Sequence, residues 1–94
     1  MLYMIVERFR GGDPVPVYRR LRERGRMVPE GLAYISSWVT ADLTTCYQVM
    51  ETEDRALLDQ WIAAWSDLTE FEVISIITSE EASQGVNQRL SRGI

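Results

Sequence analysis

Four short runs of β-branched, aromatic and other apolar residues predict four strands. They are residues 2–9, 32–39, 45–51 and 71–78. Each run ends at turn-forming or capping residues, such as Gly11-Gly12 after the first, as is typical of strands that end at a sheet edge. We therefore expect a β-rich domain in which the second and third runs form a hairpin.

Helical spacing of apolar residues predicts two helices between these strands. The first follows Asp13 as a cap, with Pro14 in its first turn, and its apolar positions recur as far as Val28. The second follows residues 52–54, and its wide apolar stripe runs over about three turns to Leu68. A short third helix is predicted from residue 79 to about residue 90, with Ser79-Glu80-Glu81 as its start.

The order βαββαβ predicts an α+β ferredoxin-like sandwich, with a four-stranded antiparallel sheet and two helices on one of its faces. Every strand carries large apolar residues at both alternating positions, so the face without helices also needs a cover. We expect the chain to pair with itself as a homodimer, face to face, in a dimeric α/β barrel. No repeat or linker divides the chain, so residues 1–94 are expected to form one domain.

The length of the hairpin loop decides which residues of the second and third strands share a face, because a shift of one residue inverts every side chain. A loop of even length places Trp38 opposite Tyr47 and Ser37 opposite Gln48. A loop of odd length places Trp38 opposite Cys46. We favour the even loop.

Four hairpin residues lie near one another in either register and are the ligand-binding candidates: Tyr34, Trp38, Gln48 and Met50. Aromatic side chains with a few polar groups are typical of a small-molecule pocket, and equally of a packed dimer core. Gln48 lies in the middle of its strand, where a buried amide needs either a neighbouring partner or a ligand.

Glu7 is the candidate catalytic residue. A carboxylate in a dry groove has a raised pKa that suits proton abstraction, whereas at a strand end the same residue is solvated or paired with an arginine.

Two further features, the tryptophan pair of the second helix and the single cysteine, have two interpretations each. Trp61 and Trp65 either stack a planar ligand or, as their helical spacing favours, pack in the core. Cys46 is either a nucleophile or, as we favour, a small buried hydrophobe.

The composition excludes several kinds of chemistry. The chain has no histidine and no lysine, and Cys46 is its only cysteine. Without histidine it lacks the commonest metal ligand, general base and haem ligand, so we expect no metal and no cofactor. A single cysteine allows no internal disulfide, which favours the cytoplasm. No apolar run approaches the roughly 20 residues of a membrane span, and the first nine residues do not resemble an export signal.

Charge is distributed unevenly: residues 1–30 carry +3 and residues 31–94 carry −7, for a net charge of −4. Five arginines between positions 19 and 26 suggest a nucleic-acid surface. Around a helix, however, they form two short rows that Glu23 interrupts, and the rest of the chain repels a polyanion. We expect no nucleic-acid binding, and expect these arginines to meet acidic residues of the same dimer.

Several segments resemble a bacterial family, domain of unknown function 3303, over nearly residues 1–80. They are MLYMIVERF, SWVTAD, YQVMETED and LLDQWIAAWSDLTEFEV. The resemblance implies membership of the dimeric α/β-barrel superfamily, with its cofactor-independent quinol monooxygenases, muconolactone isomerases and haem-dependent chlorite dismutases and peroxidases. The family itself implies no settled activity, and the haem branch is disfavoured because the chain has no histidine.

The sequence leaves four functions open. The first is a non-enzymatic homodimeric α/β-barrel protein that binds a small apolar or aromatic molecule. The second is a cofactor-independent oxygenase or isomerase, with Glu7 as base and Gln48 as the residue that orients the substrate. The third is a structural or protein-interaction module, and the fourth a nucleic-acid binder. A cavity would separate the first two from the third, and a carboxylate directed into that cavity would separate the enzyme from the carrier.

Overall fold

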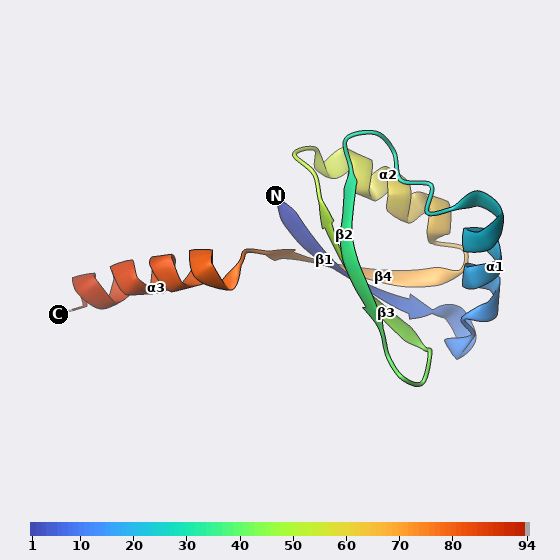
Figure 1. The fold of residues 1–94 in the computed structure, drawn as a ribbon, viewed down its shortest axis with the longest axis horizontal. Helices are drawn as coiled ribbons and strands as arrows, with labels where there is room; N and C mark the ends of the chain where they lie inside the picture. The colour runs from blue at the N-terminus through green and yellow to red at the C-terminus, as the bar shows by residue number, and fades with distance from the viewer. Residues whose placement is uncertain (94) are drawn as a thin grey trace.

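A computed structural model, which describes residues 1–93, confirms the α+β ferredoxin-like fold and the order βαββαβ (Figure 1). The strands are β1 (Leu2–Phe9), β2 (Ala33–Val39), β3 (Thr45–Glu51) and β4 (Thr69–Ile76). They form one antiparallel sheet in the order β2-β3-β1-β4. The helices are α1 (Val15–Arg24), α2 (Arg55–Trp65) and α3 (Ser79–Arg92), and a 3-10 turn, η1 (Arg10–Gly12), follows β1.

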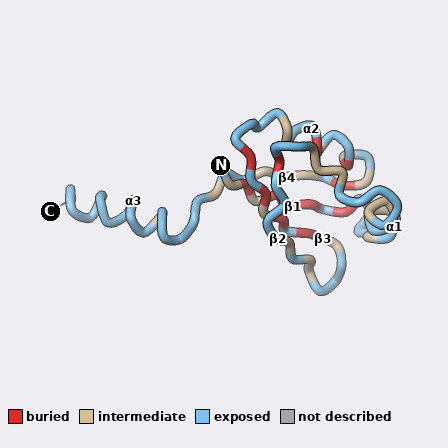
Figure 2. Tube along the Cα trace, turned by 45° about the horizontal axis from the view of Figure 1, so that its top comes forward, coloured by how far each residue is buried: buried red, intermediate tan, exposed pale blue. Residues whose placement is uncertain are grey.

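The core lies between the sheet and the layer formed by α1 and α2 (Figure 1). Its buried members are Tyr3, Ile5, Leu32, Met50, Leu58, Trp61 and Trp65. Figure 2 shows buried residues along the central strands and within α2, while no residue of α3 is buried. Because side chains alternate along a strand, the odd-numbered residues of β1 and the even-numbered residues of β3 point towards the helices.

Next to its loop the hairpin has the favoured even-loop register, but a bulge between Tyr34 and Ser36 shifts it by one residue, so that Tyr34 pairs with Met50 as in the odd-loop alternative. Trp38 pairs with Tyr47 and Ser37 pairs with Gln48. The Asp42 carboxylate closes the loop by accepting hydrogen bonds from the hydroxyls of Thr40 (2.6 Å) and Thr44 (2.8 Å). Ser37 and Gln48 therefore lie on the same face of the sheet, the one that α1 and α2 cover.

Two element boundaries differ from the sequence prediction. Helix α1 ends at Arg24 and does not continue to Val28, because Gly25 takes a left-handed φ of 69° and its N–H donates to the Leu21 carbonyl oxygen. Strand β4 begins and ends two residues earlier than predicted. Its partner β1 sets those limits, since Phe9 pairs with Thr69 and Leu2 with Ile76.

The terminal helix α3 is present and longer than predicted. Its cap is Thr78, whose hydroxyl accepts from the Glu81 N–H (3.1 Å), while the Glu81 carboxylate accepts from the Thr78 N–H. The helix projects away from the sheet, beyond the end of β4 (Figure 1). None of its residues is buried in this chain.

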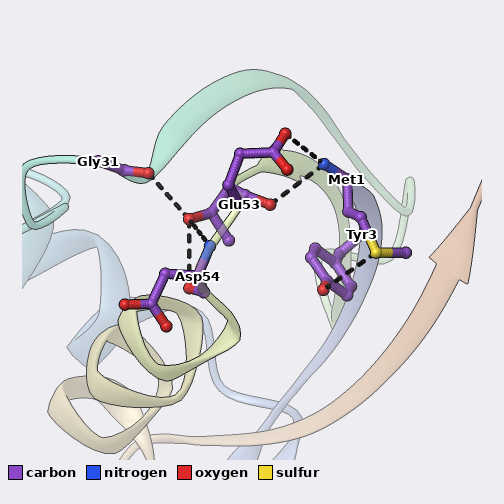
Figure 3. Close-up of polar contacts among 6 residues, drawn as sticks. Met1, Tyr3, Gly31, Glu53 and Asp54 are labelled. Atoms are coloured by element: carbon purple, nitrogen blue, oxygen red, sulfur yellow. Dashed lines mark hydrogen bonds and ion pairs between the residues drawn. The ribbon is translucent and has the colours of Figure 1, made fainter.

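A hydrogen-bond network fixes the end of the sheet from which α3 leaves (Figure 3). The amino terminus of Met1 donates to the Thr52 carbonyl oxygen (3.2 Å) and to the Glu53 carboxylate (3.1 Å). The buried Thr52 hydroxyl donates to the Gly31 carbonyl oxygen (2.9 Å) and accepts from the Asp54 N–H (3.0 Å). The network joins the starts of β1, β2 and α2, so that polar groups of these three segments form hydrogen bonds with one another.

Candidate functional site

A pocket of about 90 Å³ lies between the covered face of the sheet and the two helices. Its apolar lining consists of Phe9, Val17, Tyr18, Leu21, Val39, Trp61 and Trp65. Its polar lining consists of Glu7, Arg26, Ser37, Cys46 and Gln48. The polar side chains of the strands are neighbours because Glu7 pairs with Cys46 and Ser37 with Gln48 in the sheet. The site is thus an apolar pocket with a few convergent polar groups, as is typical of small-molecule sites.

Glu7 lies inside this pocket, with 8% of its surface exposed. Its Oε2 atom accepts no hydrogen bond from any residue between 1 and 93. Burial raises the pKa of Glu7 from its ordinary 4.5 to about 7, although the Cys46 side chain as a hydrogen-bond donor and the charge of Arg26 act in the opposite direction. Near neutral pH this carboxyl therefore exchanges readily between a protonated and a charged form.

The solvated or arginine-paired position that the sequence also allowed for Glu7 is not the observed one. Its neighbours Arg8 and Arg10 form exposed ion pairs with Glu72 (3.0 Å) and Glu70 (3.3 Å) instead. Glu7 points to the helix layer because it shares the parity of the buried core residues of β1.

Cys46 is buried beside Glu7. Burial, together with the charge of Glu7 and a hydrogen bond to it, raises the pKa of the Cys46 thiol to about 12. The thiolate is the reactive form of cysteine, so this side chain is unreactive at neutral pH. The interpretation as a small buried hydrophobe fits the structure better than that of a nucleophile.

Gln48 also lines the pocket, and its Nε2 atom donates to the Met50 sulfur (3.2 Å). A thioether is a weak acceptor, so this contact satisfies the Gln48 amide only weakly. The amide therefore keeps hydrogen-bonding capacity that a ligand could use.

Arg26 holds one wall of the pocket in place. Its carbonyl oxygen accepts from the indole N–H groups of both Trp61 (2.9 Å) and Trp65 (3.0 Å). Its guanidinium lies 3.8 Å from the centre of the Tyr34 ring, and the Tyr34 hydroxyl is 2.7 Å from that of Ser37. From the sequence, Arg26 was grouped with the arginines of the first helix and not with the pocket, because the apolar spacing continues the helix to Val28 whereas α1 ends at Arg24.

The four ligand-binding candidates of the hairpin do not all lie at this pocket. Gln48 lines it, Met50 lies fully buried next to Gln48, and Tyr34 borders it through Arg26. Trp38 lies on the opposite face of the sheet, with 59% of its surface exposed. Trp61 and Trp65 belong to the core, as their spacing favours, and each also lines the pocket.

Within residues 1–93, no group of three or more acidic or cysteine side chains is arranged to hold a metal ion. No helix in that range is long and apolar enough to cross a membrane.

Comparison with known proteins identifies a family. The family described as domain of unknown function (DUF3303) matches residues 1–90. No match was found among curated proteins or among solved structures.

Proposed function

Because the chain belongs to the DUF3303 family, whose description names no activity, we propose a function from the pocket itself. The protein binds a small, partly apolar molecule there. The observation that carries the proposal is the unpartnered Oε2 atom of Glu7 in the pocket. Leaving a buried polar group without a partner costs about 1–3 kcal/mol. A ligand that donates a hydrogen bond to this atom would recover that free energy.

The pocket limits the size and chemistry of the ligand. Its volume of about 90 Å³ is below the roughly 150 Å³ of an engineered protein cavity that accepts benzene. This volume accommodates a small molecule, or one edge of a larger one. Tyr18 lines the pocket and is itself partly exposed to solvent. The ligand should present one flat apolar side to Trp61 and Trp65 and at least one N–H or O–H group to Glu7.

We expect small aromatic alcohols and amines to bind in this pocket. The measurement is a fragment screen in which NMR follows the three indole N–H signals of the protein. The signals of Trp61 and Trp65 should shift on binding, whereas that of Trp38 on the opposite face should not. The Gln48→Ala variant should bind more weakly, and the exposed Gln60→Ala variant should bind like the wild type. Fragments that shift only the Trp38 signal would place binding outside the pocket.

A second function, proton transfer without a cofactor, is favoured by the pKa of Glu7. A base is most effective when its pKa lies near the working pH, and a pKa of about 7 meets that condition. In an isomerase or oxygenase of this kind, Glu7 would remove a proton from a carbon acid and Gln48 would orient the substrate.

Hydrogen exchange of small 1,3-diketones in D₂O tests this second function. The wild type should accelerate loss of the acidic C–H signal above the rate in buffer, increasingly so as the pH rises through 7. Glu7→Gln should abolish the acceleration, because an amide cannot accept the proton. If both proteins match buffer while fragments still bind, the binding function stands alone.

We also propose that the protein is a homodimer joined through the open face of its sheet. The exposed large apolar side chains of that face are those of Trp38 on β2, Tyr47 on β3 and Ile74 on β4, and the Arg8–Glu72 ion pair lies on the same face between β1 and β4. Large apolar side chains exposed together on one face typically mark a protein interface, and an isologous dimer covers both copies at once.

Light scattering at micromolar concentration is expected to give the mass of two chains. Trp38→Glu should shift the mass towards that of one chain, because it replaces an exposed apolar side chain of the open face with a charge. Gln60→Glu, an equal change of charge on the outer side of α2, should leave the mass unchanged. A wild-type protein with the mass of a single chain would contradict the proposed dimer.

A further inference from the structure

We propose that α3 is an arm exchanged between the two chains of the homodimer, and that it packs on the partner's α1 beside the mouth of the Glu7 pocket. Its seat is a hollow lined by Pro14, Val15, Tyr18 and Leu43. The inference rests on the homodimer proposed above and adds the surface that α3 occupies and its connection to the pocket.

Helix α3 carries an apolar stripe that its own chain leaves exposed. Ala82, Val86 and Leu90 recur every four residues and form one apolar stripe, of which Val86 is 51% and Leu90 is 63% exposed. At 14 residues the helix is near the lower limit at which isolated helices are stable in water, so its stability should come from packing of that stripe. No residue of α3 is buried within residues 1–93.

The hollow on α1 is an apolar surface with one unusual residue. Leu43, at the tip of the β2–β3 hairpin, has a left-handed φ of 64° and is 53% exposed. Glycine or asparagine is normally found in this conformation, and a leucine there costs about 1–2 kcal/mol. A bulky apolar side chain held in solvent at such a cost is best explained by a contact that it makes in the assembly.

The arm and the hollow lie at opposite ends of the sheet. Helix α3 follows Ile76, which pairs with Leu2 at the start of β1. The hollow lies beside the other end of β1, where the Phe9 N–H donates to the Thr44 carbonyl oxygen (3.0 Å). When two sheets stack face to face with their strands running in opposite directions, the start of each α3 lies over the end of the partner's sheet at which the hollow lies. Within one chain, α3 points away from α1 (Figure 1).

The charges of the two surfaces are complementary. Glu80 and Glu81 lie in the first turn of α3. Arg19, Arg22 and Glu23 line the depression next to the hollow, and neither arginine forms an ion pair with any residue described in this chain. An acidic helix end beside an unpaired arginine row favours this docking over the pairing of one α3 with another. It also gives these arginines acidic partners in the same dimer.

Docking at the hollow would couple the arm to ligand binding through Tyr18. Tyr18 lines both the hollow and the Glu7 pocket, and its ring packs edge-on against that of Phe9, with 6.3 Å between the ring centres. An α3 helix seated on Tyr18 would cover the exposed side of the pocket. Each binding site would then be completed by a helix from the other chain.

Disulfide trapping tests the exchange, in a Cys46→Ala background so that only the introduced thiols react. The variant with both Leu43→Cys and Val86→Cys is expected to run as a covalent dimer on a non-reducing gel after mild oxidation at micromolar concentration. The matched control, Leu43→Cys with Gln88→Cys, should remain largely a monomer, because position 88 lies on the opposite side of α3 from position 86. Positions 43, 86 and 88 are exposed and Cys46→Ala is a small change at a buried position shared by all variants, so the fold should persist and circular dichroism should be the same for the variant and its control.

The other outcomes each overturn the inference in a recognisable way. A covalent dimer of the Val86→Cys variant alone would show that the two α3 helices pair with each other. In the double variant, an internal disulfide between positions 43 and 86 of one monomer would show that α3 folds back on its own chain. No cross-link in a protein with the mass of two chains would remove the exchanged arm and leave the homodimer intact. No cross-link in a protein with the mass of one chain would remove both proposals.

Discussion

The wild type is expected to lose folding stability as the pH rises from about 4.5 to 7, and the Glu7→Gln variant is expected to lose much less. The pKa of Glu7 is raised to about 7 in the folded chain, against 4.5 as its ordinary value. Between these two values the folded state binds the proton more tightly than the unfolded state, so raising the pH favours unfolding. The stabilising effect of the protonated form is complete below about pH 4.5 and is lost as the pH rises through 7.

The expected size of this effect is large for a small domain. One pKa unit corresponds to about 1.4 kcal/mol, so above pH 7 the Glu7→Gln variant should be more stable than the wild type by up to about 3 kcal/mol. Urea titrations at a series of pH values measure the difference. Glu51→Gln, on the exposed end of β3, should leave the pH dependence unchanged. A wild type and a Glu7→Gln variant with parallel profiles would show that the carboxyl is solvated in solution.

Leu58→Ala is expected to remove a large part of the folding stability of the protein. Leu58 is fully buried on α2 and belongs to the core cluster between helices and sheet. Truncation of a buried leucine to alanine costs about 2–5 kcal/mol, because it loses apolar contacts and leaves a cavity. A chain of this length is stable by only about 5–15 kcal/mol.

Urea unfolding of the two variants Leu58→Ala and Leu58→Met separates cavity formation from the mere change of side chain. Methionine nearly conserves the volume of leucine, so Leu58→Met should cost less than about 1.5 kcal/mol. Equal losses in the two variants would mean that the core near α2 does not depend on close packing.

Much of the fold could be predicted because strand and helix periodicities are local properties of the sequence. The hairpin register is not local in this sense: the sequence left both an even and an odd loop open, and the observed bulge between Tyr34 and Ser36 combines the two pairings. The end of α1 was not predictable either, because the stripe of apolar residues continues past Gly25 whereas the helix does not. Whether Gly25 continues a helix or caps it depends on its backbone conformation, which the apolar pattern does not encode.

The candidate site was only partly predictable. Glu7 and Gln48 were identified as polar residues in apolar strands, and both line the pocket. That Glu7 points to the same face as Gln48 could not be derived from the sequence of β1, because β1 carries large apolar residues at both alternating positions. Trp38 was grouped with the wrong neighbours: it pairs with Tyr47, and neighbouring residues of a strand point to opposite faces, so it does not share a face with Gln48. Arg26 and Tyr18 needed the tertiary structure.

The Arg26 carbonyl oxygen that accepts from both tryptophans has a consequence for motion. It ties α2 to the segment that precedes β2, and the Arg26 guanidinium continues the connection to the Tyr34 ring on β2 itself. Strand β2 lies at the edge of the sheet, where strands typically fray first. The connection makes opening of that edge depend on displacement of Trp61 and Trp65, so the edge strand and the pocket wall should loosen and tighten together.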